Sequence, residues 1–140
     1  MKLSSKGRYA VMALADLAKF DPNEPVSLRD ISLRQGISLV YLEQLFLKLK
    51  KNDVVKSIRG KKGGYILSRD ASDIKISDIF FAVDEKVKTV GCEKHSKKGC
   101  NGRSAKCISH NLWDELEVYI NNFFQQRSHS DLINKSENRI

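Results

Sequence analysis

The sequence predicts a mainly α-helical protein with a small β-hairpin wing, that is, a winged helix-turn-helix followed by a long C-terminal dimerisation helix. Three observations support this prediction. Two short helices with capping signals flank a glycine turn, a glycine- and lysine-rich hairpin follows them directly, and a long amphipathic segment lies near the C-terminus.

Serines mark the starts of the first two helices. A helix over residues 4–20 can begin at Ser4 or Ser5, because a serine hydroxyl accepts a hydrogen bond from a free backbone N–H of the first turn. A second, short helix begins after Ser27 and ends near Gly36, since glycine readily adopts the left-handed conformation that ends helices.

The third helix begins after Ser38 and has two distinct faces. One face is apolar and comprises Leu42, Leu45, Phe46 and Leu49. A different face is polar and basic and comprises Tyr41, Gln44, Lys48 and Lys51. With the preceding helix and its glycine turn, this pattern predicts a helix-turn-helix whose second helix presents polar side chains outward.

A basic hairpin follows the third helix. Residues 54–58 and 65–67 are rich in β-branched and aromatic residues, and the segment 59–64 between them consists of glycines and cations alone. From Lys48 to Lys62 there are seven basic residues and one acidic residue. Such a hairpin beside a helix-turn-helix favours contact with DNA.

We expect the DNA contacts to come from the first turns of the third helix and from the hairpin. Gln44 suits adenine, and Glu43 suits the amino group of cytosine. Arg59 suits a narrow minor groove, whereas the hairpin lysines suit phosphates. The full expected set is Ser38, Tyr41, Glu43, Gln44, Lys48, Arg59, Lys61 and Lys62.

The second half of the chain predicts a short helix over 76–83, a loop over 84–106 and a long helix over 109–127. A loop of this length without periodicity suggests a bound ligand. The long helix is apolar on two adjoining faces, which favours a shared helix between two subunits. Its expected interface residues are Leu112, Leu116, Tyr119, Ile120, Phe123 and Phe124.

These elements divide the chain into three parts. We predict a DNA-binding domain over 1–75, a ligand-binding loop with its dimerisation helix over 76–128, and a polar tail over 129–140 that frays.

Composition and charge narrow the class of protein. The net charge of +8 is uneven, because residues 1–75 carry 15 lysines and arginines against 8 acidic residues, whereas the remainder carries 10 against 9. A localised positive field favours a polyanionic partner. No apolar run is long enough to span a membrane, and we expect no signal peptide, so the cytoplasm is the expected compartment. The motifs of an enzyme, such as a phosphate loop or a nucleophile elbow, are absent from the sequence.

Three cysteines and a histidine lie close together near the start of the long helix. Cys92, Cys100, Cys107 and His110 follow the spacing Cys-x7-Cys-x6-Cys-x2-His. Three thiolates and an imidazole suit either tetrahedral zinc or an iron–sulfur cluster. Structural zinc sites usually bring ligands in close pairs, and here only the last pair is close, which disfavours zinc. His95 is an alternative ligand in the same loop.

Four stretches carry a family resemblance: MKLSSKGRYAV, DISLRQGISLVYLEQLFLKLKKNDVVKSIRGKKGGY, DASDIKISDIFFAVDE and HNLWDEL. In these, the chain resembles the IscR family of iron–sulfur cluster-responsive winged-helix transcriptional regulators. The resemblance implies a homodimer on a palindromic operator and a [2Fe-2S] cluster on Cys92, Cys100, Cys107 and His110. It also implies repression of the cluster biogenesis genes, and a role for Glu43 in excluding one class of promoter until the cluster forms.

Two other interpretations remain open. A nitric-oxide-sensing repressor of the same fold also uses three cysteines, with a different fourth ligand and often a larger cluster. A zinc- or cluster-bearing assembly protein would bind proteins instead of DNA, which the basic hairpin disfavours. In the main interpretation, the iron–sulfur cluster assembly machinery is the expected cluster donor.

Overall fold

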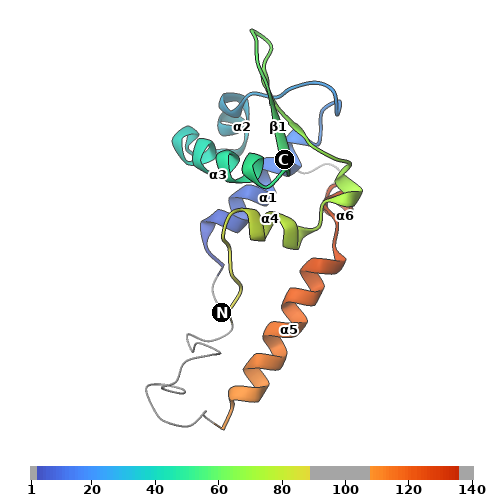
Figure 1. The fold of residues 1–140 in the computed structure, drawn as a ribbon. Helices are drawn as coiled ribbons and strands as arrows, with labels where there is room; N and C mark the ends of the chain where they lie inside the picture. Colours follow the sequence, from blue (N-terminus) through green and yellow to red (C-terminus); the bar gives the residue numbers. More distant parts are fainter. Residues whose placement is uncertain (1–2, 89–107, 136–140) are drawn as a thin grey trace.

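The computed structural model describes residues 3–88 and 108–135, which form a mostly helical fold with one antiparallel hairpin (Figure 1). None of the helices in these residues is long and apolar enough to cross a membrane. The elements are α1 (Ser5–Leu17), α2 (Leu28–Gln35), α3 (Leu39–Lys51), β1 (Val55–Ile58), β2 (Gly64–Leu67), the 3-10 helix η1 (Ala71–Asp73), α4 (Ile76–Ala82), α5 (His110–Gln126) and α6 (His129–Lys135).

The helix starts predicted from the serines are confirmed. Ser4 caps α1, the Ser27 hydroxyl accepts from the Asp30 N–H at 3.1 Å, and the Ser38 hydroxyl accepts from the Tyr41 N–H at 3.4 Å. Gly36 ends α2 with a φ of 67°, in the left-handed region that favours glycine. The first helix ends at Leu17, three residues earlier than predicted.

The core lies where α1, α2, α3 and α4 meet. The predicted apolar face of α3 is buried in it, with Leu42, Phe46 and Leu49 fully inaccessible. Leu14 of α1 and Ile79 of α4 are equally inaccessible. Because four helices bury their apolar faces against one another, the opposite face of α3 is fixed toward solvent.

The hairpin of β1 and β2, hereafter the wing (residues 55–67), projects beyond the helices (Figure 1). Strand β2 is held to the rest of the domain at Tyr65. Val26 pairs with Tyr65 through two backbone hydrogen bonds of 3.0 and 2.9 Å. The Tyr65 ring packs edge-on against Phe46 of α3, with ring centroids 4.9 Å apart. The orientation of the wing is therefore coupled to that of α3.

The predicted fraying of the tail is wrong for residues 129–135, because these form α6 against α1 and η1. The Ile76 N–H donates to the Arg127 carbonyl at 2.9 Å, and the His129 N–H donates to the Ile74 carbonyl at 2.7 Å. His129 is completely buried. Polar composition suggested a solvated tail, but these two backbone hydrogen bonds bring the segment into the core.

Candidate DNA interface and metal centre

The outward face of α3 carries four exposed side chains at helical spacing, namely Val40, Glu43, Gln44 and Leu47. They follow the positions i, i+3, i+4 and i+7 and so form one stripe. Ser38, at the N-cap, is exposed beside the first turn. The structure thus brings the predicted base-contacting residues Ser38, Glu43 and Gln44 to one surface.

Tyr41 lies at the side of this stripe and is half-buried. Its ring packs edge-on against Tyr9 of α1 at 5.8 Å, and its hydroxyl lies 3.0 Å from that of Ser5. The sequence pattern placed Tyr41 fully on the outward face and missed these contacts with α1. Tyr41 therefore also fixes the angle between α1 and α3.

The tip of the wing presents three exposed cations, Arg59, Lys61 and Lys62. The turn forms at Gly60, which has a φ of 124°. The Gly63 N–H closes it by donating to the Gly60 carbonyl at 3.0 Å. No ion pair within the described residues neutralises these three side chains. Their charge is therefore available to an anionic partner.

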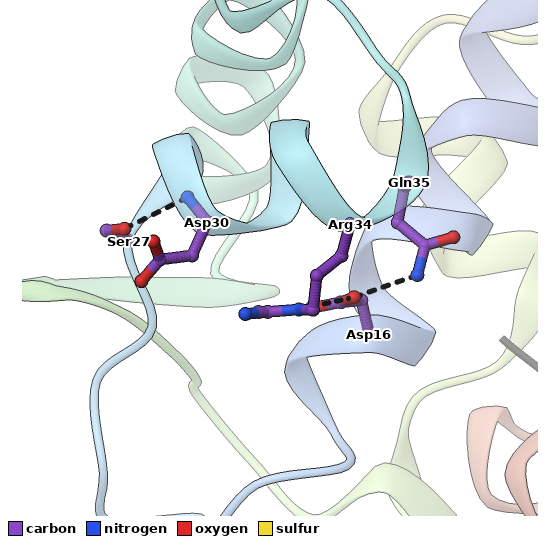
Figure 2. A network of polar contacts seen from close by, with 5 residues as sticks. All are labelled: Asp16, Ser27, Asp30, Arg34 and Gln35. Carbon is purple, nitrogen blue, oxygen red and sulfur yellow. Dashed lines mark hydrogen bonds and ion pairs between the residues drawn. The ribbon is translucent and has the colours of Figure 1, made fainter.

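A buried ionic network ties α1 to the helix-turn-helix (Figure 2). Asp16 is 2% exposed and accepts hydrogen bonds from Arg34 Nη2 at 2.7 Å, from Arg34 Nε at 3.0 Å and from Gln35 Nε2 at 2.8 Å. The hydrogen bond to Asp16 raises the pKa of the Arg34 guanidinium above its usual value, so the guanidinium stays charged. Arg34 also lies over the Phe20 ring, 4.8 Å from its centroid. This network fixes the end of α2, and with it the turn that leads into α3.

Two acidic residues that follow α4 contact the helices of the DNA interface. Asp84 forms an ion pair with Lys48 of α3 at 3.2 Å, and both side chains are exposed. Its carbonyl accepts from Lys6 Nζ at 3.3 Å. The buried Glu85 accepts from the Ser4 N–H at 2.6 Å and from the Ser4 hydroxyl. Residues 84 and 85 thus connect the start of the segment that carries the cysteines to α1 and α3.

These contacts were not predicted, because Ser4 and Glu85 are 81 residues apart and residues 84–106 were expected to form a loop without contacts to the helices. An exposed ion pair contributes about 0.2–1 kcal/mol. Lys48 can therefore exchange Asp84 for a phosphate at little cost.

Of the four predicted metal ligands, the structure describes only His110. It is the first residue of α5 and is partly exposed. Cys92, Cys100 and Cys107, together with the alternative ligand His95, lie outside the described residues. In the ranges 3–88 and 108–135 no group of three or more His, Cys, Asp or Glu side chains is arranged to hold a metal ion.

The apolar stripe of α5 is exposed along much of its length. Leu112, Leu116, Tyr119 and Phe123 are between 40% and 67% accessible. In contrast, Ile120 and Phe124 pack against the core of their own chain, and the Phe124 ring contacts Phe80 of α4 edge-on at 4.7 Å. The expected dimer residues thus separate into an exposed row and a row that attaches α5 to the domain.

Known proteins resemble this chain over nearly its whole length. The family model Rrf2, described as an iron-dependent transcriptional regulator, matches residues 3–135. The HTH-type transcriptional regulator IscR of Photorhabdus laumondii is 48% identical over 137 residues, which cover 98% of this chain and 82% of the relative. IscR of Serratia proteamaculans is 47% identical with the same coverage.

Solved structures agree in fold. The structure of T. potens IscR has a TM-score of 0.77 at 34% identity and covers 98% of this chain and 89% of that one. The structure of CymR, the global cysteine regulator of B. subtilis, has a TM-score of 0.80 at 28% identity and covers 98% of this chain and 99% of that one. The chain therefore shares its architecture with both of these proteins.

Proposed function

Because this chain belongs to the Rrf2 family of iron-dependent transcriptional regulators and is itself a DNA-binding transcriptional regulator, we propose that a [2Fe-2S] cluster determines which promoters it binds. The principal targets are the cluster biogenesis genes, which it represses. One observation carries the proposal: a single chain combines an outward face on α3 that presents Glu43 and Gln44, a cationic wing, and the spacing Cys-x7-Cys-x6-Cys-x2-His. The curated relatives are named as regulators, and the family consists of DNA-binding proteins and not of enzymes.

In this proposal α3 enters the major groove of a palindromic operator. Glu43 and Gln44 contact base edges, because the first turns of a recognition helix reach deepest into the groove. Arg59 enters the adjacent minor groove, and Lys61 and Lys62 contact phosphates. Ser38 and Tyr41 lie beside the same turns, and Lys48 leaves Asp84 for a phosphate.

The donor set fits an iron–sulfur cluster. Thiolate sulfur and imidazole nitrogen are the side-chain donors that such clusters accept. His110 begins α5, where the unsatisfied N–H groups of a helix stabilise nearby negative charge. We assign the four ligand positions to Cys92, Cys100, Cys107 and His110. When bound, a cluster there supplies a redox-active and oxidant-sensitive centre whose occupancy follows the supply of iron.

A second copy of the chain covers the exposed row of α5, so that two recognition helices address the two half-sites of one operator. The ligand-bearing segment joins α4 at Asp84 and Glu85 and joins α5 at His110. Occupancy of the centre is thereby connected to α1 and α3. The cluster assembly machinery supplies the cluster, and the protein acts in the cytoplasm.

Oxygen-free purification with absorption spectroscopy and iron and sulfide analysis tests the cluster. We expect a coloured protein with equal amounts of iron and sulfide, two of each per chain. His110→Ala should abolish the colour or shift its spectrum, and His95→Ala, the matched control, should leave it unchanged. Colourless protein contradicts the proposal, zinc in place of iron supports an assembly protein, and a larger cluster supports the nitric-oxide-sensing interpretation.

Promoter choice tests the coupling. We expect cluster-loaded protein to bind a wider set of sites than cluster-free protein, measured by fluorescence anisotropy on duplexes selected with each form. Glu43→Ala should let the cluster-free protein bind the additional sites, because an unpaired carboxylate is repelled by the phosphates of a site that offers it no donor. Identical site preference of the two wild-type forms would refute the coupling.

A further inference from the structure

The first turn of α3 presents an apolar side chain that packing does not explain. Val40 is 64% exposed, and it is not among the residues of α3 that are buried in the core. A polar side chain would therefore fit at this position equally well. Val40 shares the outward stripe with Gln44, one helical turn later. The Ser38 hydroxyl caps this turn by accepting from the Tyr41 N–H, so the direction of the Val40 side chain is set by the fold.

We propose that Val40 contacts the C5-methyl group of a thymine in the major groove and so selects an A·T pair at one position of each half-site. This proposal rests on the orientation of α3 proposed above. The thymine methyl is the apolar group that the major groove displays, and it marks T·A pairs uniquely. An aliphatic side chain is suited to it because the contact removes both apolar surfaces from water.

The spacing along α3 limits where that thymine lies. Side chains at i and i+4 have Cβ atoms about 5–6 Å apart, and successive bases of one strand are about 3.4 Å apart. The thymine should therefore lie within about two base pairs of the base that Gln44 contacts. Two neighbouring positions, one read by a hydrogen bond and one by an apolar contact, give an A·T-specific step.

Deoxyuridine scanning tests this inference with the full-length chain. A duplex is first selected from a random pool with wild-type protein, and each thymine is then replaced singly by deoxyuridine, which pairs identically and lacks the methyl group. We expect the wild type to lose affinity about four-fold at one position per half-site, the effect of exposing about one buried CH2 group. Fluorescence anisotropy measures the loss.

The Val40→Ala variant identifies the side chain. It should bind the parent duplex about four-fold more weakly per half-site and show no further loss on the deoxyuridine duplex. Leu47→Ala is the matched control, since Leu47 is 65% exposed on the same stripe two turns away from Val40. This variant should keep the full deoxyuridine penalty, whatever its affinity for the parent. Circular dichroism confirms that both variants fold.

Three outcomes separate the two proposals. A duplex that tolerates deoxyuridine at every position overturns the assignment of Val40 and leaves the regulator function intact. A deoxyuridine penalty that persists in Val40→Ala assigns the methyl contact to another residue and also overturns it. Failure to select any duplex contradicts the proposed DNA interface itself.

Discussion

Removing Arg34 should destabilise the domain more than removing Asp16, although the two form one ion pair. In Arg34→Met, the Asp16 carboxylate, which is 2% exposed in the wild type, keeps one described side-chain donor, Gln35, which lies 2.8 Å away in the wild type. Breaking a buried pair in this way costs about 3–5 kcal/mol. In Asp16→Ala, the Arg34 side chain, already 38% exposed, turns toward water, so the cost is about 1–2 kcal/mol.

Urea denaturation followed by circular dichroism at neutral pH measures both free energies of unfolding. The double variant Asp16→Ala/Arg34→Met should be more stable than Arg34→Met alone, because it leaves no buried charge uncompensated. Arg29→Met is the control, since Arg29 is exposed on the same helix and its loss should cost less than about 0.5 kcal/mol. If Arg34→Met is no less stable than Arg29→Met, the network does not hold α2 in place.

Three further predictions concern single positions. Lys61→Ala should weaken binding to all duplexes alike and reduce the slope of log affinity against log salt by about 0.9, measured by salt titration; an unchanged slope would remove Lys61 from the phosphate contacts. Burial lowers the pKa of His129 from its ordinary 6.5. The free energy of unfolding should therefore decrease as pH falls below about 6.5, because His129 binds a proton in the unfolded chain and stays neutral in the folded chain. His129→Leu should abolish that part of the pH dependence in urea titrations. Gly7→Ala should destabilise the fold by about 1–3 kcal/mol, because an added Cβ would lie 2.8 Å from Glu85 Cγ and 2.9 Å from Phe80 Cε1; thermal denaturation that shows a gain would contradict this packing.

Local signals predicted the elements that position the DNA interface. The hydroxyls of Ser27 and Ser38 accept hydrogen bonds from backbone N–H groups three residues away. The start of each helix can therefore be predicted from a few neighbouring residues. The apolar face of α3 was equally predictable, because the helical spacing of its apolar residues separates buried from exposed positions. The base-contacting candidates followed from that separation.

Contacts between distant segments were not predictable. Tyr41 has the spacing of an exposed residue, and only the approach of Tyr9 from α1 makes it half-buried. His129 follows a polar stretch, and only pairing with Ile74, more than 50 residues earlier, brings it into the core. Cys92, Cys100 and Cys107 are predicted to be metal ligands from their thiol chemistry and their spacing. They lie outside the described residues, so this assignment stays a prediction.

The way α5 is attached makes it a lever. Its C-terminal end is fixed by the packing of Phe124 on Phe80 and by the hydrogen bond that the Arg127 carbonyl accepts from Ile76, and the rest of the helix extends away from the domain (Figure 1). At 1.5 Å per residue, its 17 residues extend about 25 Å, so a tilt of about 5° at the fixed end moves the His110 end by about 2 Å. The same geometry works in reverse, so a small displacement at His110 exerts torque on α4, which packs directly against α3.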